Sequence, residues 1–225
     1  MQKIEKKHII IYIDLLGSTQ KIINDTDEQA FVGIKHIYDN MIKGMLNNVS
    51  KTWNIKTKVF SDNVIIGYEV EGDERGIAYN LNKMIRVAAL FQFFAMACHW
   101  PVRGGLTMGN LYIDDIFVWG KGLLRAYELE NNIAVFPRII IDKELLPMLE
   151  KYETEIQGWK MDLGLPIVDY LGLLGDDEIV GTQRKSICNL LKEADDNERV
   201  LGKIEWLKKY YNDWCRKSDK LHLII

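Results

Sequence analysis

The chain has 225 residues, 48% of them hydrophobic, which is enough for one domain with additions, or one domain and a small lobe. The net charge of −3 argues against a general nucleic-acid binder. Three widely separated cysteines without zinc or redox spacing favour a reducing, cytoplasmic location. No signal peptide is predicted, because the first residues lack a long apolar region. No membrane insertion is predicted, because the longest apolar stretch, Val87 to Trp100, is too short to span a bilayer.

The first hundred residues are predicted to contain both strands and helices. Apolar periodicity and turn residues predict these elements in order: strand His8–Asp14, helix Ser18–Ile23, helix Glu28–Asn47, hairpin strands Lys56–Phe60 and Val64–Val70, and helix Glu74–His99.

The next fifty residues again combine strands and helices. Pro101 forces an extended start to a strand at Val102–Met108. The elements predicted after it are a hairpin of Asn110–Ile113 and Ile116–Trp119, helix Gly120–Glu130, strand Ala134–Ile141 and helix Asp142–Tyr152. The order predicts an α+β fold with a largely antiparallel sheet and helices on one face.

The character of the chain changes after residue 152. We predict one domain over residues 1–152 and a mainly helical C-terminal extension over 153–225, packed on the same domain. The extension holds a short apolar segment, Ile167–Leu174, and a helix at Gly181–Lys217. That helix carries an aromatic stripe, which fits packing against the domain or contacts in a dimer: Trp206, Tyr210, Tyr211 and Trp214.

The first strand ends in a single carboxylate, Asp14, followed by the turn Gly17-Ser18-Thr19. A buried unpaired charge is costly, so a cation beside Asp14 would explain its position. Successive backbone N–H groups in such a turn suit a phosphate. The alternative is that Asp14 or Ser18 only caps the following helix.

Two further positions carry candidate chemistry. If the first strand lies beside the hairpin, Asp62 in its turn meets Asp14 at one sheet edge, and both could hold Mg²⁺ or Mn²⁺ with a backbone carbonyl. Asp62 also reads as an ordinary turn aspartate. Arg103 precedes Gly104-Gly105 and suits phosphate oxygens, or it is a surface arginine beside a bulge.

Four stretches, in order, resemble motifs of the class III nucleotidyl cyclase family. Asp14–Thr19 resembles its Asp-Ile-x-Gly-Phe-Thr turn, and Lys58–Asp62 its Lys-x-x-Gly-Asp stretch, with serine for glycine. Arg103–Gly109 resembles Arg-x-Gly-x-His-x-Gly, with Thr107 in place of histidine. Trp119–Ala126 resembles the Gly-x-x-Val-Asn-x-Ala helix start, so that the match covers about residues 8 to 141.

This resemblance implies a class III cyclase-like βαββαβ core and a homodimer with active sites at the interface. It implies catalytic roles for Asp14, Asp62 and Arg103. Two Mn²⁺ or Mg²⁺ ions per site would be held by Asp14, Leu15 and Asp62. The triphosphate of the substrate would be bound by the following residues: Leu16, Gly17, Ser18, Thr19 and Arg103.

The chain departs from the family at the residues that recognise the base and at those that stabilise the transition state. The family's transition-state asparagine and arginine align with Leu124 and Glu128, and its purine-reading aspartate aligns with Phe117. Lys58 stands where a purine-reading lysine is common. Residues expected in the base pocket are Lys58, Phe60 and Phe117. Arg125 and Arg138 are candidates to replace the missing asparagine and arginine, and the alternative is that each is a surface or capping residue.

A narrower resemblance is to the Pycsar pyrimidine cyclases of bacterial anti-phage defence. It rests on these stretches: Phe60–Asp62, Val102–Gly105, Ala126–Glu130 and Phe136–Ile139. It implies that the chain converts UTP or CTP to a 3′,5′-cyclic monophosphate that activates a separate effector. The alternatives are a purine (adenylate) cyclase, a nucleotide sensor without turnover, and a plain dimerisation domain.

Overall fold

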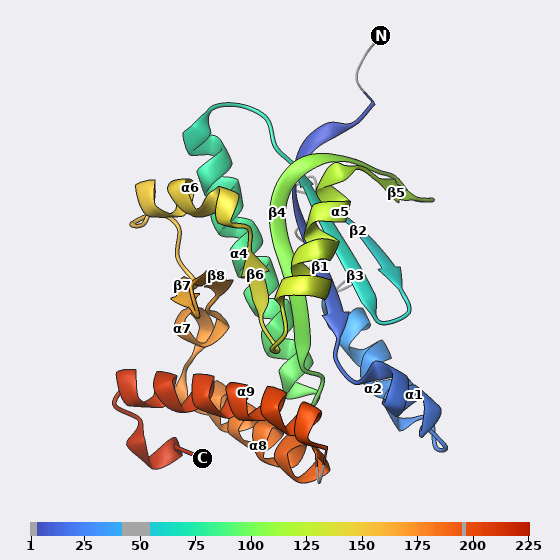
Figure 1. Cartoon of the computed structure of the whole chain (residues 1–225), viewed down its shortest axis with the longest axis vertical. Helices are drawn as coiled ribbons and strands as arrows, with labels where there is room; N and C mark the ends of the chain where they lie inside the picture. Colours follow the sequence, from blue (N-terminus) through green and yellow to red (C-terminus); the bar gives the residue numbers. More distant parts are fainter. Residues whose placement is uncertain (1–3, 42–54, 195–196) are drawn as a thin grey trace.

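The fold is organised around β1 (Lys6–Leu15), a central strand whose apolar run is paired on both sides. The structure is a computed structural model and describes residues 4–41, 55–194 and 197–225. Its sheet has the strand order β2-β3-β1-β4-β6-β8-β7, and β5 pairs with β4 (Figure 1). The other strands are β2 (Ile55–Phe60), β3 (Asn63–Glu69), β4 (Val102–Ile113), β5 (Val118–Trp119), β6 (Ile139–Ile141), β7 (Trp159–Asp162) and β8 (Leu165–Val168).

The helices pack around this sheet and below its lower end (Figure 1). They are α1 (Ser18–Ile23), α2 (Gln29–Tyr38), α4 (Glu74–Ala97), α5 (Lys121–Glu128), α6 (Leu146–Lys151), α7 (Tyr170–Leu174), α8 (Asp177–Ala194) and α9 (Glu198–Lys217). A π-helical turn, Leu129–Ile133, continues α5, and 3₁₀ turns occupy Lys143–Leu145 and Leu221–Leu223.

Alternate side chains of β1 enter two different apolar layers. Ile9, Ile11 and Ile13 are fully buried in the main core, to which α4 contributes. Ile10 points to the opposite face and packs with Leu111 and with α5. Helices therefore cover both faces of the sheet, and the prediction of helices on one face is wrong. The α+β class and the mostly antiparallel sheet are confirmed, with β4 and β6 pairing in parallel.

Several predicted elements differ from the structure; for example, the strands predicted at 102–108 and 110–113 form the single strand β4. The helix predicted at 28–47 begins at Gln29, and residues 42–47 lie outside the described residues. Of the strand predicted at 134–141, only Ile139–Ile141 pairs in the sheet. The single helix predicted at 181–217 is two helices, because the Asn197 side chain accepts a hydrogen bond from the Val200 amide and caps a new start.

The C-terminal extension contributes strands as well as helices. β7 and β8 form a hairpin, and Ile167 of β8 pairs with Ile140 of β6, so the extension lengthens the central sheet. The split of the Ile167–Leu174 segment into β8 and α7 was not foreseen. Tyr210 and Tyr211 of the aromatic stripe are buried in the main core, as the packing interpretation predicts. The domain boundary at residue 152 stays a prediction.

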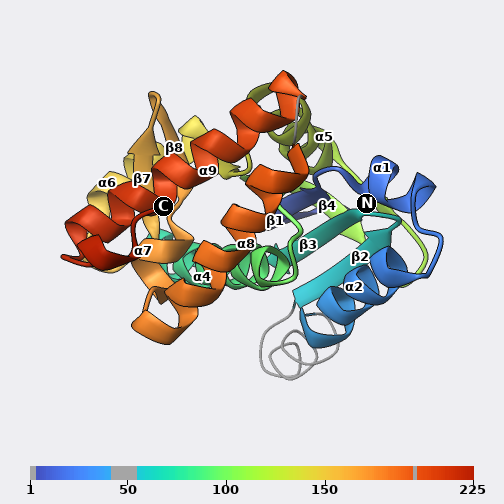
Figure 2. The same ribbon diagram turned by 90° about the horizontal axis from the view of Figure 1, so that it is seen from below.

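Several strands and helices begin or end at the lower end of the sheet in Figure 1. There β1 ends, α1 begins, and α8 and α9 cross beneath (Figures 1 and 2). Within the described ranges, no helix combines the length and apolarity needed to cross a bilayer.

Candidate active site

Asp14 and Asp62 lie at the same end of neighbouring strands. Asp14 is opposite Asn63 in the antiparallel β1–β3 ladder, so the Asp62 turn sits directly beside the end of β1. The Leu15 amide donates to the Asp62 carbonyl over 3.2 Å and fixes this arrangement. Two acidic side chains that are far apart in sequence therefore converge at one sheet edge, where the hairpin pattern predicts them.

Polar neighbours orient the Asp62 carboxylate. The Ser18 hydroxyl donates to Oδ2 of Asp62, and the side-chain Nδ2 of Asn63 donates to its Oδ1 over 3.1 Å. Tyr12 donates in turn to the Asn63 side chain over 2.8 Å. Both carboxylate oxygens of Asp62 are thus held in place, which is the support that a metal-binding carboxylate needs.

Arg103 lies between two carboxylates. Its Nε donates to Oδ2 of Asp14 over 3.0 Å, and it also lies 2.6 Å from Oε1 of Glu130, in an ion pair without hydrogen-bond geometry. Burial raises the pKa of the Asp14 carboxyl above its ordinary value, and the neighbouring Asp62 adds to the rise, while Arg103 opposes it.

Glu130 is the residue of this site that the sequence analysis missed. It is 2% exposed and follows α5, in the π-helical turn. A side chain on Gly105 would meet the Ala126 carbonyl at 2.3 Å, so only glycine lets the end of α5 approach β4 here. Burial raises the pKa of Glu130 to about 7, against the lowering effect of Arg103. The adjacent glycines after Arg103 were the available signal of this close approach.

The turn after Asp14 has the backbone shape that its sequence predicts. Gly17 adopts φ +81°, the left-handed conformation that glycine tolerates best. The amides of Ser18 and Thr19 open α1 and have no partner within the helix. The Leu16 amide donates to the Pro101 carbonyl over 2.8 Å, so in this conformation it is not available to a phosphate.

A divalent metal fits this edge only if other ligands complete its shell. Among the described residues, no three His, Cys, Asp or Glu side chains are arranged to hold a metal ion. Asp14 and Asp62 supply two carboxylates, and Mg²⁺ is commonly bound by one or two carboxylates together with substrate phosphates. The donor set thus fits a metal that arrives with, or is completed by, a nucleotide.

The three residues predicted for the base pocket come from two separate elements, β2 and the loop that follows β4. Phe60 ends β2 beside the Asp62 turn and is 79% exposed. Phe117 lies beyond β4, where its ring is 5.1 Å from that of Tyr112. The Tyr112 hydroxyl and two backbone amides lower the pKa of Asp114 to about 2, and Lys58 contributes to this shift, so Lys58 is near the Phe117 loop.

The two arginines considered as replacements for the family's transition-state arginine are already paired. Arg125 forms a bidentate pair with Asp142, with both N–O distances at 2.8 Å. Arg138 is 3% exposed and pairs with Asp162. Both side chains therefore stabilise the fold in this structure.

Comparisons with known proteins found similarity at the level of the fold and none at the level of the sequence. No family model matches the sequence, and neither does any curated protein. The adenylyl cyclase CyaB from P. aeruginosa superposes with a TM-score of 0.50 at 15% identity, covering 73% of this chain and 92% of that one. The chain has a nucleotidyl cyclase fold. The guanylyl cyclase Cya2 matches at 14% identity with a TM-score of 0.46, covering 73% of this chain and 90% of its own.

Proposed function

We propose that this chain is a divalent-metal-dependent nucleotidyl cyclase, a lyase that converts a nucleoside triphosphate to its 3′,5′-cyclic monophosphate and pyrophosphate. The observation that carries the proposal is the convergence of Asp14 and Asp62 at one sheet edge, beside Arg103, on this fold. A plain dimerisation domain gives no reason to hold two carboxylates and an arginine together in a half-buried site.

In this mechanism Asp14 and Asp62 would hold two Mn²⁺ or Mg²⁺ ions, and the Leu15 carbonyl would be a further ligand. Bound ions of this kind lower the pKa of an attacking hydroxyl and neutralise charge on the triphosphate. The chain itself positions the substrate: the Gly17, Ser18 and Thr19 amides bind phosphate oxygens. The Leu16 amide can also bind a phosphate oxygen if its hydrogen bond to the Pro101 carbonyl breaks.

Arg103 changes partners during this cycle. In the free protein it is held by Asp14 and Glu130, and a bound triphosphate competes for the same donors. The pKa of Glu130, raised to about 7, lets this carboxyl accept a proton when the guanidinium turns toward phosphate. Glu130 therefore keeps Arg103 in place until substrate arrives.

The substrate we favour is a pyrimidine triphosphate, UTP before CTP, with the cyclic product activating a separate effector in anti-phage defence in the cytoplasm. Support comes from the sequence motifs and from Phe117, which stands where a purine-reading aspartate is usual. The purine alternative is supported by Lys58, which lies near Asp114 and so has an acidic partner of the kind that reads adenine.

A homodimer with shared active sites is the assembly that we favour, and the position of Phe117 relative to Arg103 on β4 supports it. Arg103 is the second residue of this strand and Ile113 is the last, which corresponds to about 33 Å of fully extended chain. Phe117 lies beyond Ile113, at the end of β4 away from Arg103, which supports a site whose Phe117 and Arg103 come from two protomers. Exposed apolar side chains of the segment after β4 and of α5 suit a partner surface: Ile116, Trp119, Leu124 and Tyr127.

The central experiment is incubation of the full chain with each of the four ribonucleoside triphosphates and Mn²⁺, followed by mass spectrometry. We expect cyclic UMP or cyclic CMP from the wild type, and a loss of about 10²-fold or more in Asp14→Asn and Asp62→Asn. Cyclic AMP as the main product would support the purine alternative. Nucleotide binding without any cyclic product would show a sensor in place of an enzyme.

Mixing two inactive variants tests the shared site. Asp14→Asn and Lys58→Ala each damage a different half, so a mixed dimer keeps one intact site and regains part of the activity. Leu124→Glu places a charge on the proposed interface and should give a monomer in analytical ultracentrifugation. Full activity of a monomer would contradict the dimer.

A further inference from the structure

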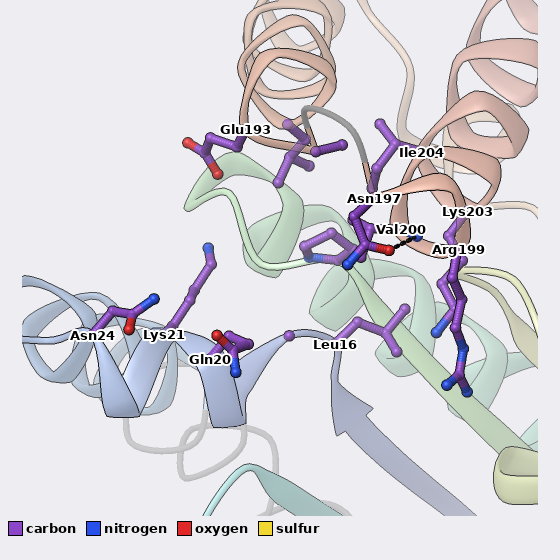
Figure 3. A pocket seen from close by; sticks show the side chains of 14 residues that line it. Leu16, Gln20, Lys21, Asn24, Glu193, Asn197, Arg199, Val200, Lys203 and Ile204 are labelled. Atoms are coloured by element: carbon purple, nitrogen blue, oxygen red, sulfur yellow. Dashed lines mark hydrogen bonds between the residues drawn. The ribbon is translucent and has the colours of Figure 1, made fainter.

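A cavity of about 560 Å³ lies beside the turn that follows β1. Leu16 and Gly17 line one side of it, and Arg199, Lys203 and Ile204 of α9 line the other (Figure 3). The cavity thus joins the predicted phosphate turn to the C-terminal extension, which has so far been given no role in the reaction.

Arg199 and Lys203 of α9 line this cavity, and Arg103 of β4 is close enough to Lys203 to affect its charge. Burial lowers the pKa of Lys203, and the positive charges of Arg103 and Arg199 lower it further, while Asp14 opposes them. No ion pair joins Arg199 or Lys203 to any residue in the described ranges. Like charges held this close repel one another, and a bound anion would relieve that repulsion.

The helix that carries these cations is firmly docked. Trp206, one turn after Lys203, stacks on Phe136 with ring centroids 5.8 Å apart, and its Nε1 donates to Asp162 over 3.3 Å. Trp206 also stacks on Tyr210 at 5.4 Å. α9 is therefore a rigid support, and Lys203 lies on it within electrostatic reach of Asp14.

We propose that Arg199 and Lys203 bind the polyphosphate end of the nucleotide, so that the C-terminal extension completes the catalytic site from within the same protomer. This inference rests on the proposed function, because it assigns the ligand of that same site. Arg125 and Arg138 are already paired with buried or half-buried carboxylates, whereas these two cations face an open cavity beside Asp14.

The side of the cavity away from α9 carries an acidic residue, and this indicates where the phosphate end of the nucleotide would lie. Glu193 lies there, near Lys21, as Figure 3 shows. Lys21 already donates to the His99 carbonyl over 2.8 Å and lies 4.4 Å from the Trp100 ring centroid. The uncompensated positive charge is therefore on the side of α9, and a phosphate chain would lie between α9 and the Gly17 turn.

Calorimetric titration of the full chain with pyrophosphate, tripolyphosphate and UMP, each with Mn²⁺, tests this assignment. Arg199→Gln and Lys203→Gln should each weaken pyrophosphate and tripolyphosphate binding about tenfold, and UMP binding by less than about twofold. Lys203→Arg should restore most of the affinity. The matched control is Lys209→Gln, which removes an exposed charge from the same helix and should change nothing.

The outcomes separate this inference from the proposed function. Unchanged pyrophosphate affinity in the folded Arg199→Gln and Lys203→Gln proteins, or no polyphosphate binding by the wild type, would overturn it. If the wild type cyclises a nucleotide while both variants keep their KM and pyrophosphate affinity, only the inference fails. If polyphosphate binding depends on Lys203 but no triphosphate is cyclised, the inference stands and the proposed function fails. Lys203→Arg and Arg199→Gln still provide the test if Lys203→Gln does not fold.

Discussion

Glu130 and Arg103 form an ion pair with 2.6 Å between Oε1 and Nε, next to a second carboxylate, Asp14. Glu130 is almost fully buried, and the single guanidinium serves both acids. Burial therefore outweighs the pairing at Glu130 and raises its pKa to about 7. The site holds more negative charge than its one arginine neutralises, a state that divalent cations would relieve.

The raised pKa of Glu130 predicts a pH-dependent cost to stability. The unfolded chain releases this proton near pH 4.5 and the folded chain only near 7, so the folded state binds more protons between these values. The free energy of unfolding of the wild type should therefore fall by about 3 kcal/mol, relative to Glu130→Gln, as pH rises from 4.5 to 7. Urea unfolding across this range measures it. Exposed Glu150→Gln is the control, and parallel curves for wild type and Glu130→Gln would contradict the prediction.

The Ser18 hydroxyl predicts a change in metal affinity. It is buried and donates to Asp62 Oδ2, so Ser18→Ala leaves that carboxylate less well oriented. Loss of such a supporting hydrogen bond commonly costs 10- to 100-fold in metal affinity, and we expect the half-saturating Mn²⁺ concentration for activity to rise about tenfold. Tyr38→Phe is a suitable control, because its hydroxyl bonds the neighbouring Ser61 carbonyl and neither carboxylate. An unchanged Mn²⁺ dependence would exclude Ser18 from this role.

Local patterns were sufficient to predict the core of the site. The alternation in β1 and the turn between β2 and β3 determine strand pairing, and pairing places Asp14 beside Asp62 without further information. Asn197 followed by Glu198 was a readable helix start, and it separates α8 from α9.

Long-range partners could not be predicted in the same way. Glu130 reads as the exposed end of a helix, and only the packing of α5 against Gly105 brings it to Arg103. Arg125 was a plausible catalytic cation until the fold placed Asp142 against it. No pattern in the sequence relates such pairs, because their contact depends on how two separate elements pack.

The pairing of Arg125 with Asp142 predicts a structural phenotype. Asp142 is fully buried, and it also accepts a hydrogen bond from the Thr107 hydroxyl over 2.8 Å. Thr107 stands where the class III cyclase motif that this stretch resembles has histidine. Burial alone would raise the pKa of Asp142, but the bonds from Arg125 and Thr107 bring it below its ordinary value.

Arg125→Ala should therefore reduce the free energy of unfolding by about 3 kcal/mol, since it leaves a buried carboxylate unpaired. Arg75→Ala, which breaks an exposed pair with Glu155, should cost less than about 1 kcal/mol. Chemical denaturation of both variants measures the difference. A fully stable Arg125→Ala protein that lacks turnover would instead indicate a catalytic role.

The packing of α9 predicts that Trp206 affects pyrophosphate affinity without contacting the ligand, because it holds the helix that carries Arg199 and Lys203. Trp206→Ala removes the stacks on Phe136 and Tyr210 and should cost about 2 kcal/mol, less than for a fully buried tryptophan. Because Arg199 and Lys203 are carried on the same helix, pyrophosphate affinity should fall with it, even at temperatures where the variant is folded. Trp206→Phe keeps an aromatic ring and loses only the bond to Asp162, so it should retain most of that affinity. Calorimetry and thermal unfolding on the same samples separate the two effects, and a destabilised Trp206→Ala protein with wild-type pyrophosphate affinity would show that the position of α9 does not matter to the ligand.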